Sequence, residues 1–177
     1  MTAFDTAWDL LKMPLIPSSL QEITSEKRPK LEGHFAPTRS YKAQFRDPVT
    51  NEILPLVVDY VNRLNSWGDQ LHSYTGKIGD DKKGDRGKLR YEVPDKRQSI
   101  TSVNWVSPWN LGNKAYPAWT ETREGRRGRG YAPALYDVIS YLMDKNQNVP
   151  LSPSTEQKAS AKNMWKDRDR WPVRDDL

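Results

Sequence analysis

The chain has 177 residues and a formal net charge of +5, with 36% hydrophobic and 29% charged residues, which fits a single domain with short extensions. With no Cys and two His, the composition excludes a disulfide framework, a thiol nucleophile and a Cys- or His-rich metal centre. No apolar run reaches the roughly eighteen residues of a membrane helix and no secretory signal follows the first Met, so we expect a cytoplasmic protein without a membrane segment.

The first 39 residues predict an arm outside the main domain. Residues 2–12 favour a short amphipathic helix, which Thr2 can cap and Pro14 ends. Residues 17–39 are polar and contain several Pro, a composition typical of a linker or an irregular wrap. We expect the arm to dock on its own domain or on a neighbouring subunit, or else to bind another partner.

A β-hairpin is the clearest element of the chain. Residues 40–46 alternate apolar and polar side chains, residues 47–52 have turn chemistry, and Ile53–Val61 is strongly apolar. We expect Ile53–Val61 to lie in the interior of a sheet, with Val57 among its buried side chains.

Further strands follow this hairpin. Leu71–Ile78 and Leu89–Val93 predict a second hairpin around a mobile Gly- and Asp-rich loop at 79–87. Two more strands are predicted at Ile100–Val106 and Tyr116–Thr122, because β-branched and aromatic residues recur there.

Helical spacing of apolar residues returns late in the chain. It predicts a helix over Pro133–Lys145, with Pro tolerated in the first turn and residues 146–148 closing the helix. A short strand at Val149–Leu151, a final helix at 154–168 and a polar tail at 169–177 are expected to follow. The expected class is therefore α+β, with a mixed, mainly antiparallel sheet and flanking helices.

Basic residues are concentrated in one place, residues 123–130, which we call the Arg/Gly turn. It contains four Arg, three Gly and one Glu, between a predicted strand and a predicted helix. The first amides of a helix lack internal partners and attract anions, and Gly allows close backbone approach. The turn is therefore a candidate anion cradle; an exposed, solvated turn and an RNA-binding patch remain as alternatives.

The sequence Arg127-x-x-Gly130-x-Ala132 resembles the Q/R-x-x-G-x-G/A pattern of the GNAT (Gcn5-related) N-acetyltransferases, where a helix also follows. The ending of the chain, with a short strand, Ser152-Pro153-Ser154 and an aromatic-bearing helix, is similar to small phage-type members. The resemblance covers residues 116–168, and the first hairpin loosely. It implies a GNAT-like domain over 40–168 with an extended N-terminal arm.

This resemblance implies direct transfer of an acetyl group from acetyl-CoA to an amine on a small molecule or a protein, with no metal. The main chain of the Arg/Gly turn would hold the pyrophosphate, and residues 119–122 would bind the pantetheine arm. Glu121 is the candidate base. The implied coenzyme-binding residues are Trp119, Thr120, Thr122, Arg127, Gly128, Arg129, Gly130, Tyr131, Ala132 and Asn163.

Two features depart from the family pattern. Residues 119–124 are more polar than usual, and Trp165 stands where the family often has a Tyr that acts as the acid. Tyr136 and Tyr141 are substitute acids, or else packing residues. The alternative function is a non-catalytic phage structural protein, or a nucleic-acid-binding protein on the same scaffold.

The start of the chain points to a source. Residues 6–14 resemble N-terminal segments of small proteins from environmental bacteriophages. We therefore expect the protein in the host cytoplasm or in a virion, with residues 1–39 available for contacts in a homo-oligomer or a virion.

Overall fold

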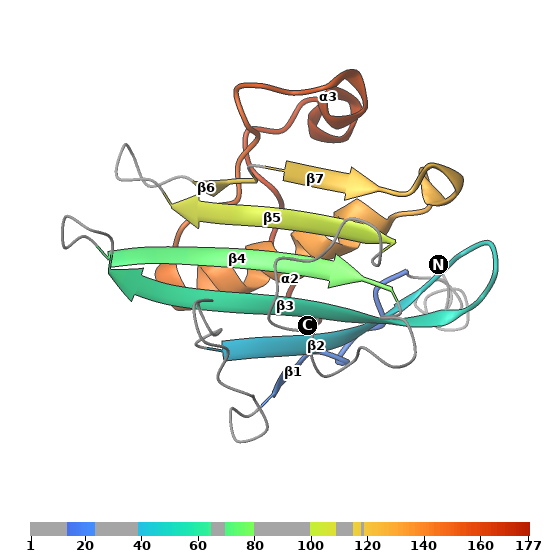
Figure 1. The fold of residues 1–177 in the computed structure, drawn as a ribbon, viewed down its shortest axis with the longest axis horizontal. Helices are drawn as coiled ribbons and strands as arrows, with labels where there is room; N and C mark the ends of the chain where they lie inside the picture. Colours follow the sequence, from blue (N-terminus) through green and yellow to red (C-terminus); the bar gives the residue numbers. More distant parts are fainter. Residues whose placement is uncertain (1–13, 24–38, 65–69, 80–99, 109–114, 118) are drawn as a thin grey trace.

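The computed structural model of the chain describes residues 14–23, 39–64, 70–79, 100–108, 115–117 and 119–177 (Figure 1). Its strands are β1 (Gln21–Ile23), β2 (Arg39–Arg46), β3 (Ile53–Leu64), β4 (Gln70–Ile78), β5 (Thr101–Pro108), β6 (Ala115–Tyr116) and β7 (Trp119–Thr122). Its helices are the 3-10 helix η2 (Glu124–Arg126) and the α-helices α2 (Tyr131–Gln147) and α3 (Ala159–Trp165).

The strands form one sheet in which each pairs antiparallel with the next, in the order β1 to β6. β7 pairs with the first half of β5 and β6 with its last residues. Leu151 adds a single parallel bridge to Ala115 of β6. The expected class, a mainly antiparallel sheet with helices, is thus confirmed.

The first hairpin forms as predicted, from β2 and β3 paired through Phe45 and Leu54. The alternation of buried and exposed side chains along β3 differs from the prediction at one residue. The side chains of β3 that reach the core are Leu54, Leu56, Val58 and Tyr60. Val57, expected to be buried, is only half-buried, because alternate residues of a strand point to opposite faces.

The α2 helix packs across the face of the sheet that carries these core residues, and in Figure 1 it lies behind β4 and β5. Gly76 of β4 permits close contact, since a Cβ there would lie 2.8 Å from Leu135 of α2. Asn148 ends α2 in the left-handed conformation with φ of 53°, as the Asn-rich stretch predicts. The helix begins two residues earlier than expected.

Three predicted helices and strands are shorter in the structure, and one strand was not predicted. The final helix covers Ala159–Trp165 and not 154–168, because Pro153 and the Ser154 turn precede it; the Ser154 carbonyl and hydroxyl both accept local hydrogen bonds. The strand predicted at Val149–Leu151 is one bridge, and the strand predicted at Tyr116–Thr122 is divided at Pro117. β1 lies within the segment predicted as a linker.

Other predictions fall outside the described residues: the helix at 2–12, the strand at Leu89–Val93 and most of the loop at 79–87. Of the helices described, none has the length and apolar character that a membrane span requires.

Residues 169–177, expected as a polar tail, pack against the domain through Trp171. Its side chain is buried, its backbone N–H donates to the Leu151 carbonyl at 2.7 Å, and its indole N–H donates to Asp137 of α2 at 2.8 Å. The Ser18 amide donates to the Asp176 carbonyl at 3.0 Å, so this segment also contacts the chain before β1.

Candidate functional site

The Arg/Gly turn joins β7 to α2, as the sequence indicates. Gly128 and Gly130 adopt positive φ values of 73° and 84°, which L side chains rarely adopt. Gly130 is the N-cap of α2, and no described side chain caps the helix there. The first-turn amides of Tyr131 and Ala132 are therefore main-chain donors at the positive end of the helix.

The two glycines differ in their surroundings. No described atom lies within 4 Å of the position that a Cβ on Gly128 would take. At Gly130 a Cβ would lie 3.3 Å from Pro14, so this residue is covered by the segment before β1. Of these two glycines, Gly128 is thus the open one.

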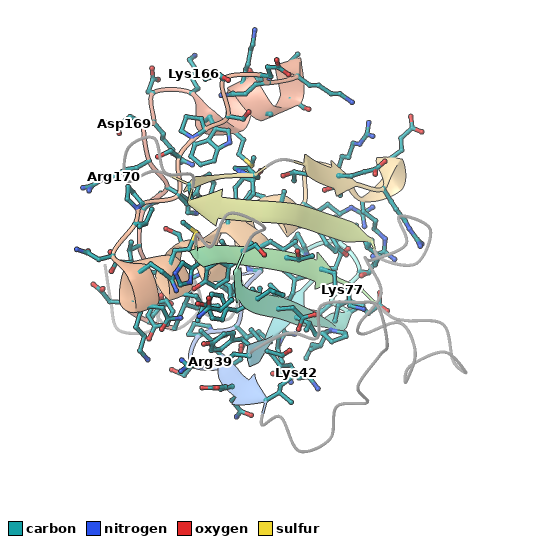
Figure 2. All side chains as sticks on the ribbon, turned by 60° about the vertical axis from the view of Figure 1, so that its left-hand side comes forward. Arg39, Lys42, Lys77, Lys166, Asp169 and Arg170 are labelled. Carbon is teal, nitrogen blue, oxygen red and sulfur yellow. The ribbon has the colours of Figure 1, made fainter. Side chains whose placement is uncertain are left out.

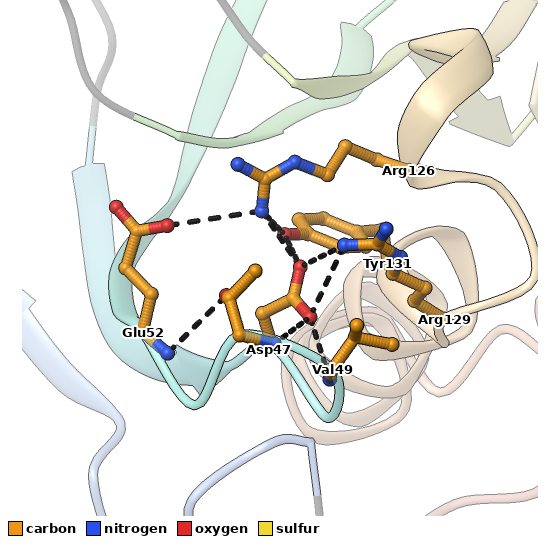
Figure 3. Close-up of polar contacts among 7 residues, drawn as sticks. Asp47, Val49, Glu52, Arg126, Arg129 and Tyr131 are labelled. Carbon is orange, nitrogen blue, oxygen red and sulfur yellow. Dashed lines mark hydrogen bonds and ion pairs between the residues drawn. The ribbon is translucent and has the colours of Figure 1, made fainter.

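A buried carboxylate holds the Arg/Gly turn against the β2–β3 hairpin (Figure 3). Asp47 has no exposed side-chain surface and accepts hydrogen bonds from Arg126 at 2.7 Å and from Arg129 at 3.1 Å. The Tyr131 hydroxyl, on the first residue of α2, donates to the same carboxylate at 2.6 Å. Three residues of the turn and the helix start therefore converge on one hairpin residue.

The hairpin itself orients this carboxylate. The amides of Val49 and Thr50 donate to Oδ1 of Asp47 at 2.8 and 3.1 Å, which is the arrangement of an Asx turn. Burial alone raises the pKa of the Asp47 carboxyl, but the hydrogen bonds from Tyr131, the two turn amides and Arg126 outweigh it. The net result is a pKa well below the usual range, so Asp47 is ionised at neutral pH.

The pKa of the Tyr131 hydroxyl, which donates to Asp47, shifts in the opposite direction. Burial, and then its hydrogen bond to the Asp47 carboxylate, raise the pKa of Tyr131 to about 12. The Tyr131 hydroxyl therefore stays protonated and donates its hydrogen bond to Asp47. Of the groups of Tyr131, only the main-chain amide remains for the predicted binding of coenzyme A.

The arginines of the turn divide into two groups. Arg129, predicted to pair with a ligand, instead pairs with Asp47, as does Arg126. Arg127 is exposed and donates its Nε to the Thr122 carbonyl at 3.1 Å. An anion at this turn would thus contact the main-chain amides and Arg127, whereas Arg126 and Arg129 are engaged with Asp47.

Beside β7 lies a cavity of about 170 Å³. Its lining residues come from β7, α2 and the segment around α3: Pro117, Thr120, Tyr136, Ser154, Glu156, Gln157, Lys158, Ser160, Ala161 and Trp165. β6 and β7 both pair with β5 along one edge. On the opposite edge, Leu151 pairs with β6, but no described strand pairs with β7.

The hydrogen-bond pattern of β7 shows which main-chain groups face this edge. The Arg123 amide donates to the Ile100 carbonyl at 2.8 Å, so this amide points toward the chain of β5. The Thr122 carbonyl belongs to the same peptide group and points the opposite way. Because the direction of main-chain groups repeats every second residue of a strand, the N–H and C=O of Thr120 and Thr122 point away from β5. The contact of Arg127 with the Thr122 carbonyl agrees with this direction.

A pair of hydroxyl groups lies at the wall of the cavity. The Thr120 hydroxyl and the Tyr136 hydroxyl are 2.6 Å apart. The Tyr136 ring packs against Trp165 and Trp171, with ring centroids 5.5 and 5.2 Å away. Burial raises the pKa of Tyr136 to about 12, so its hydroxyl remains a proton donor at neutral pH.

The remaining predicted residues are not all brought together. Glu121 is exposed, and strand alternation places it on the face of β7 opposite to Thr120. Asn163 is exposed on α3, outside the residues that line the cavity. Trp119 lies in β7, paired with Asn104. In the part of the chain that the structure describes, no cluster of His, Asp and Glu fits a metal ion.

Sequence reasoning missed Asp47 as a site residue. The sequence Asp47-Pro48-Val49-Thr50 is typical of an Asx turn, which predicts a carboxylate engaged with local amides. Its second set of partners lies 79 and more residues later in the chain, and no local pattern indicates them.

Comparison of the chain with protein-family models, with curated proteins and with solved structures gives no match in any of the three.

Proposed function

We propose that the chain is an N-acyltransferase that moves an acetyl group from acetyl-CoA directly to an amine. The observation that carries the proposal is the alignment of three features along β7. They are the cavity beside its open edge, the outward main-chain groups of Thr120 and Thr122, and the Arg/Gly turn where the strand ends.

Coenzyme A has the chemistry that these features complement. Its pantetheine arm carries two amides, which can pair with an open strand edge as a further strand does. Its pyrophosphate suits a turn with positive-φ glycines and a helix N-terminus. The resemblance of Arg127-x-x-Gly130-x-Ala132 to the GNAT pattern supports the same assignment.

The reaction needs one proton removed and one supplied. The amine nitrogen bonds to the thioester carbon, the carbon–sulfur bond breaks, the amine loses a proton to a base and the departing thiolate gains one. Tyr136 is the proposed donor to the thiolate, because its protonated hydroxyl lines the cavity. Glu121, on the other face of β7, is the proposed base on the acceptor side, acting through water.

Among the described residues, the charge distribution favours a small anionic ligand over a nucleic acid. Broad nucleic-acid surfaces gather Lys and Arg on one face. Here Arg39 and Lys42 lie at one end of the molecule and Lys166 and Arg170 at the other, the latter next to the acidic Asp169 (Figure 2). Two arginines of the Arg/Gly turn are also paired with Asp47.

Calorimetric titration with acetyl-CoA tests the proposal, with two matched variants. Gly128→Glu places a carboxylate at the open one of the two positive-φ glycines and is expected to abolish binding. Gly125→Glu adds the same charge in η2, three residues before Gly128, at another position with no described atom within 4 Å of its Cβ, and is expected to retain binding. Wild-type protein that binds no acetyl-CoA at millimolar ligand would refute the proposal.

A further inference from the structure

The Arg/Gly turn is less basic at its surface than its sequence indicates. Of its four arginines, Arg126 and Arg129 direct their guanidinium groups onto Asp47, and their side chains are 28% and 23% exposed. Asp47 itself is 0% exposed and accepts hydrogen bonds from five donors. A carboxylate with this many donors has little capacity to release an arginine to a competing anion.

The same contacts determine the conformation of the turn. Gly125 and Gly128 would have no described neighbour within 4 Å even with a Cβ, so packing at these positions does not restrain the backbone. Besides the main-chain hydrogen bonds of η2, the side chains that leave the turn restrain it. These are Arg126 and Arg129 on Asp47, and Arg127 on the Thr122 carbonyl.

We infer that Asp47 determines the class of anion that the Arg/Gly turn accepts. By holding Arg126 and Arg129 it keeps the main-chain amides of the turn in place for a compact phosphate group. It also cancels one of the two guanidinium charges and holds both guanidinium groups against the hairpin. The identity of the compact ligand, coenzyme A, rests on the proposed function; the exclusion of polyanions does not.

The exclusion follows from the way polyanions bind. Their affinity for proteins depends on the number of cationic side chains that displace counterions from the phosphate backbone. The buried Asp47 carboxylate cancels one of the two guanidinium charges, and its hydrogen bonds hold both groups in place, so the pair contributes less to that displacement than two unpaired arginines. Glu52 has no comparable effect, because its contact with Arg126 is 3.7 Å long and its side chain is half-exposed.

The experiment compares Asp47→Asn with Glu52→Gln, which removes one carboxylate charge from the same hairpin. Binding of a 20-nucleotide single-stranded RNA is measured at two salt concentrations, and binding of acetyl-CoA is measured in parallel. Asp47→Asn is expected to raise RNA affinity about tenfold at low salt and to steepen the salt dependence by about 0.7 log units per decade, which corresponds to the one positive charge that Asp47 no longer cancels. It is expected to weaken acetyl-CoA binding, whereas Glu52→Gln changes neither.

A folded Asp47→Asn variant with wild-type RNA affinity and salt dependence would overturn the inference. If this variant does not fold, the RNA affinities of Arg126→Gln and Arg127→Gln, each made in the wild-type protein, test the same inference. The paired Arg126 is expected to contribute less to RNA binding than the exposed Arg127; equal losses would overturn the inference. If Asp47→Asn gains RNA affinity but wild-type protein binds no acetyl-CoA, the proposed enzyme is wrong and the exclusion of polyanions stands.

Discussion

Val57 and Val58 are adjacent in β3, yet Val58 is fully buried beside α2 whereas Val57 lies half-buried on the opposite face of the sheet. We expect Val58→Asp to destabilise the domain by about 3–5 kcal/mol, because it leaves an unpaired charge in the core. Val57→Asp is the matched control, with the same change one residue away and a much smaller expected effect. Thermal unfolding followed by circular dichroism measures both, and equal melting temperatures would show the described register to be wrong.

Acid is expected to destabilise the protein through Asp47. Its pKa is lowered in the folded state from about 3.9 in an unfolded chain. A lowered folded-state pKa contributes stability above the unfolded value, and this contribution is lost as pH falls below about 4. Urea unfolding at pH 7 and at pH 3 should therefore show a larger loss for wild type than for Asp47→Asn. Parallel pH profiles of the two proteins would contradict this.

Trp171 is expected to stabilise both the C-terminal segment and the wall of the cavity. Trp171→Ala removes ring contacts with Tyr136 and Trp165, each with centroids 5.2 Å away, and should cost about 3–5 kcal/mol. Trp171→Phe keeps an aromatic ring but loses the hydrogen bond to Asp137, so a loss of about 1 kcal/mol is expected. Denaturant midpoints rank the two variants, and a Trp171→Ala protein as stable as wild type would exclude this role.

Tyr136→Phe is expected to lower kcat about 100-fold with little change in the KM for acetyl-CoA, since it removes the proposed proton donor and keeps the ring. Tyr141→Phe is the control on the same helix, because Tyr141 does not line the cavity. An initial-rate assay of thiol release with a panel of amines gives both constants. Equal kcat values for the two variants would remove Tyr136 from the mechanism.

Local patterns in the sequence were sufficient for the elements that local physics determines. The alternation in 40–46 predicted β2, and helical spacing followed by Asn148 predicted α2 and its end. The face of β3 that is buried could not be read in the same way, because both Val57 and Val58 are apolar. Which one is covered depends on where α2 packs.

The site was predictable only in part, for a similar reason. Positive φ at Gly128 and Gly130 follows from the Gly-rich turn. The pairing of Arg126 and Arg129 with Asp47 does not, since it depends on how the first hairpin and the start of α2 are brought together. Charge counted along the sequence therefore overstated the charge that the turn presents.

The distance between Asp47 and Arg126 along the chain, 79 residues, has a consequence for how the protein folds. The strands β2, β3 and β4 pair with their neighbours in sequence across residues 47–52 and 65–69, so these contacts close short loops and can form early. The contact between Asp47 and Arg126 can form only when both the first hairpin and the start of α2 have reached their places. During synthesis and refolding, the chain therefore passes through states in which all four arginines of the Arg/Gly turn are unpaired. We expect RNA to bind the chain in such states, so that adding RNA to a refolding mixture lowers the yield of native protein.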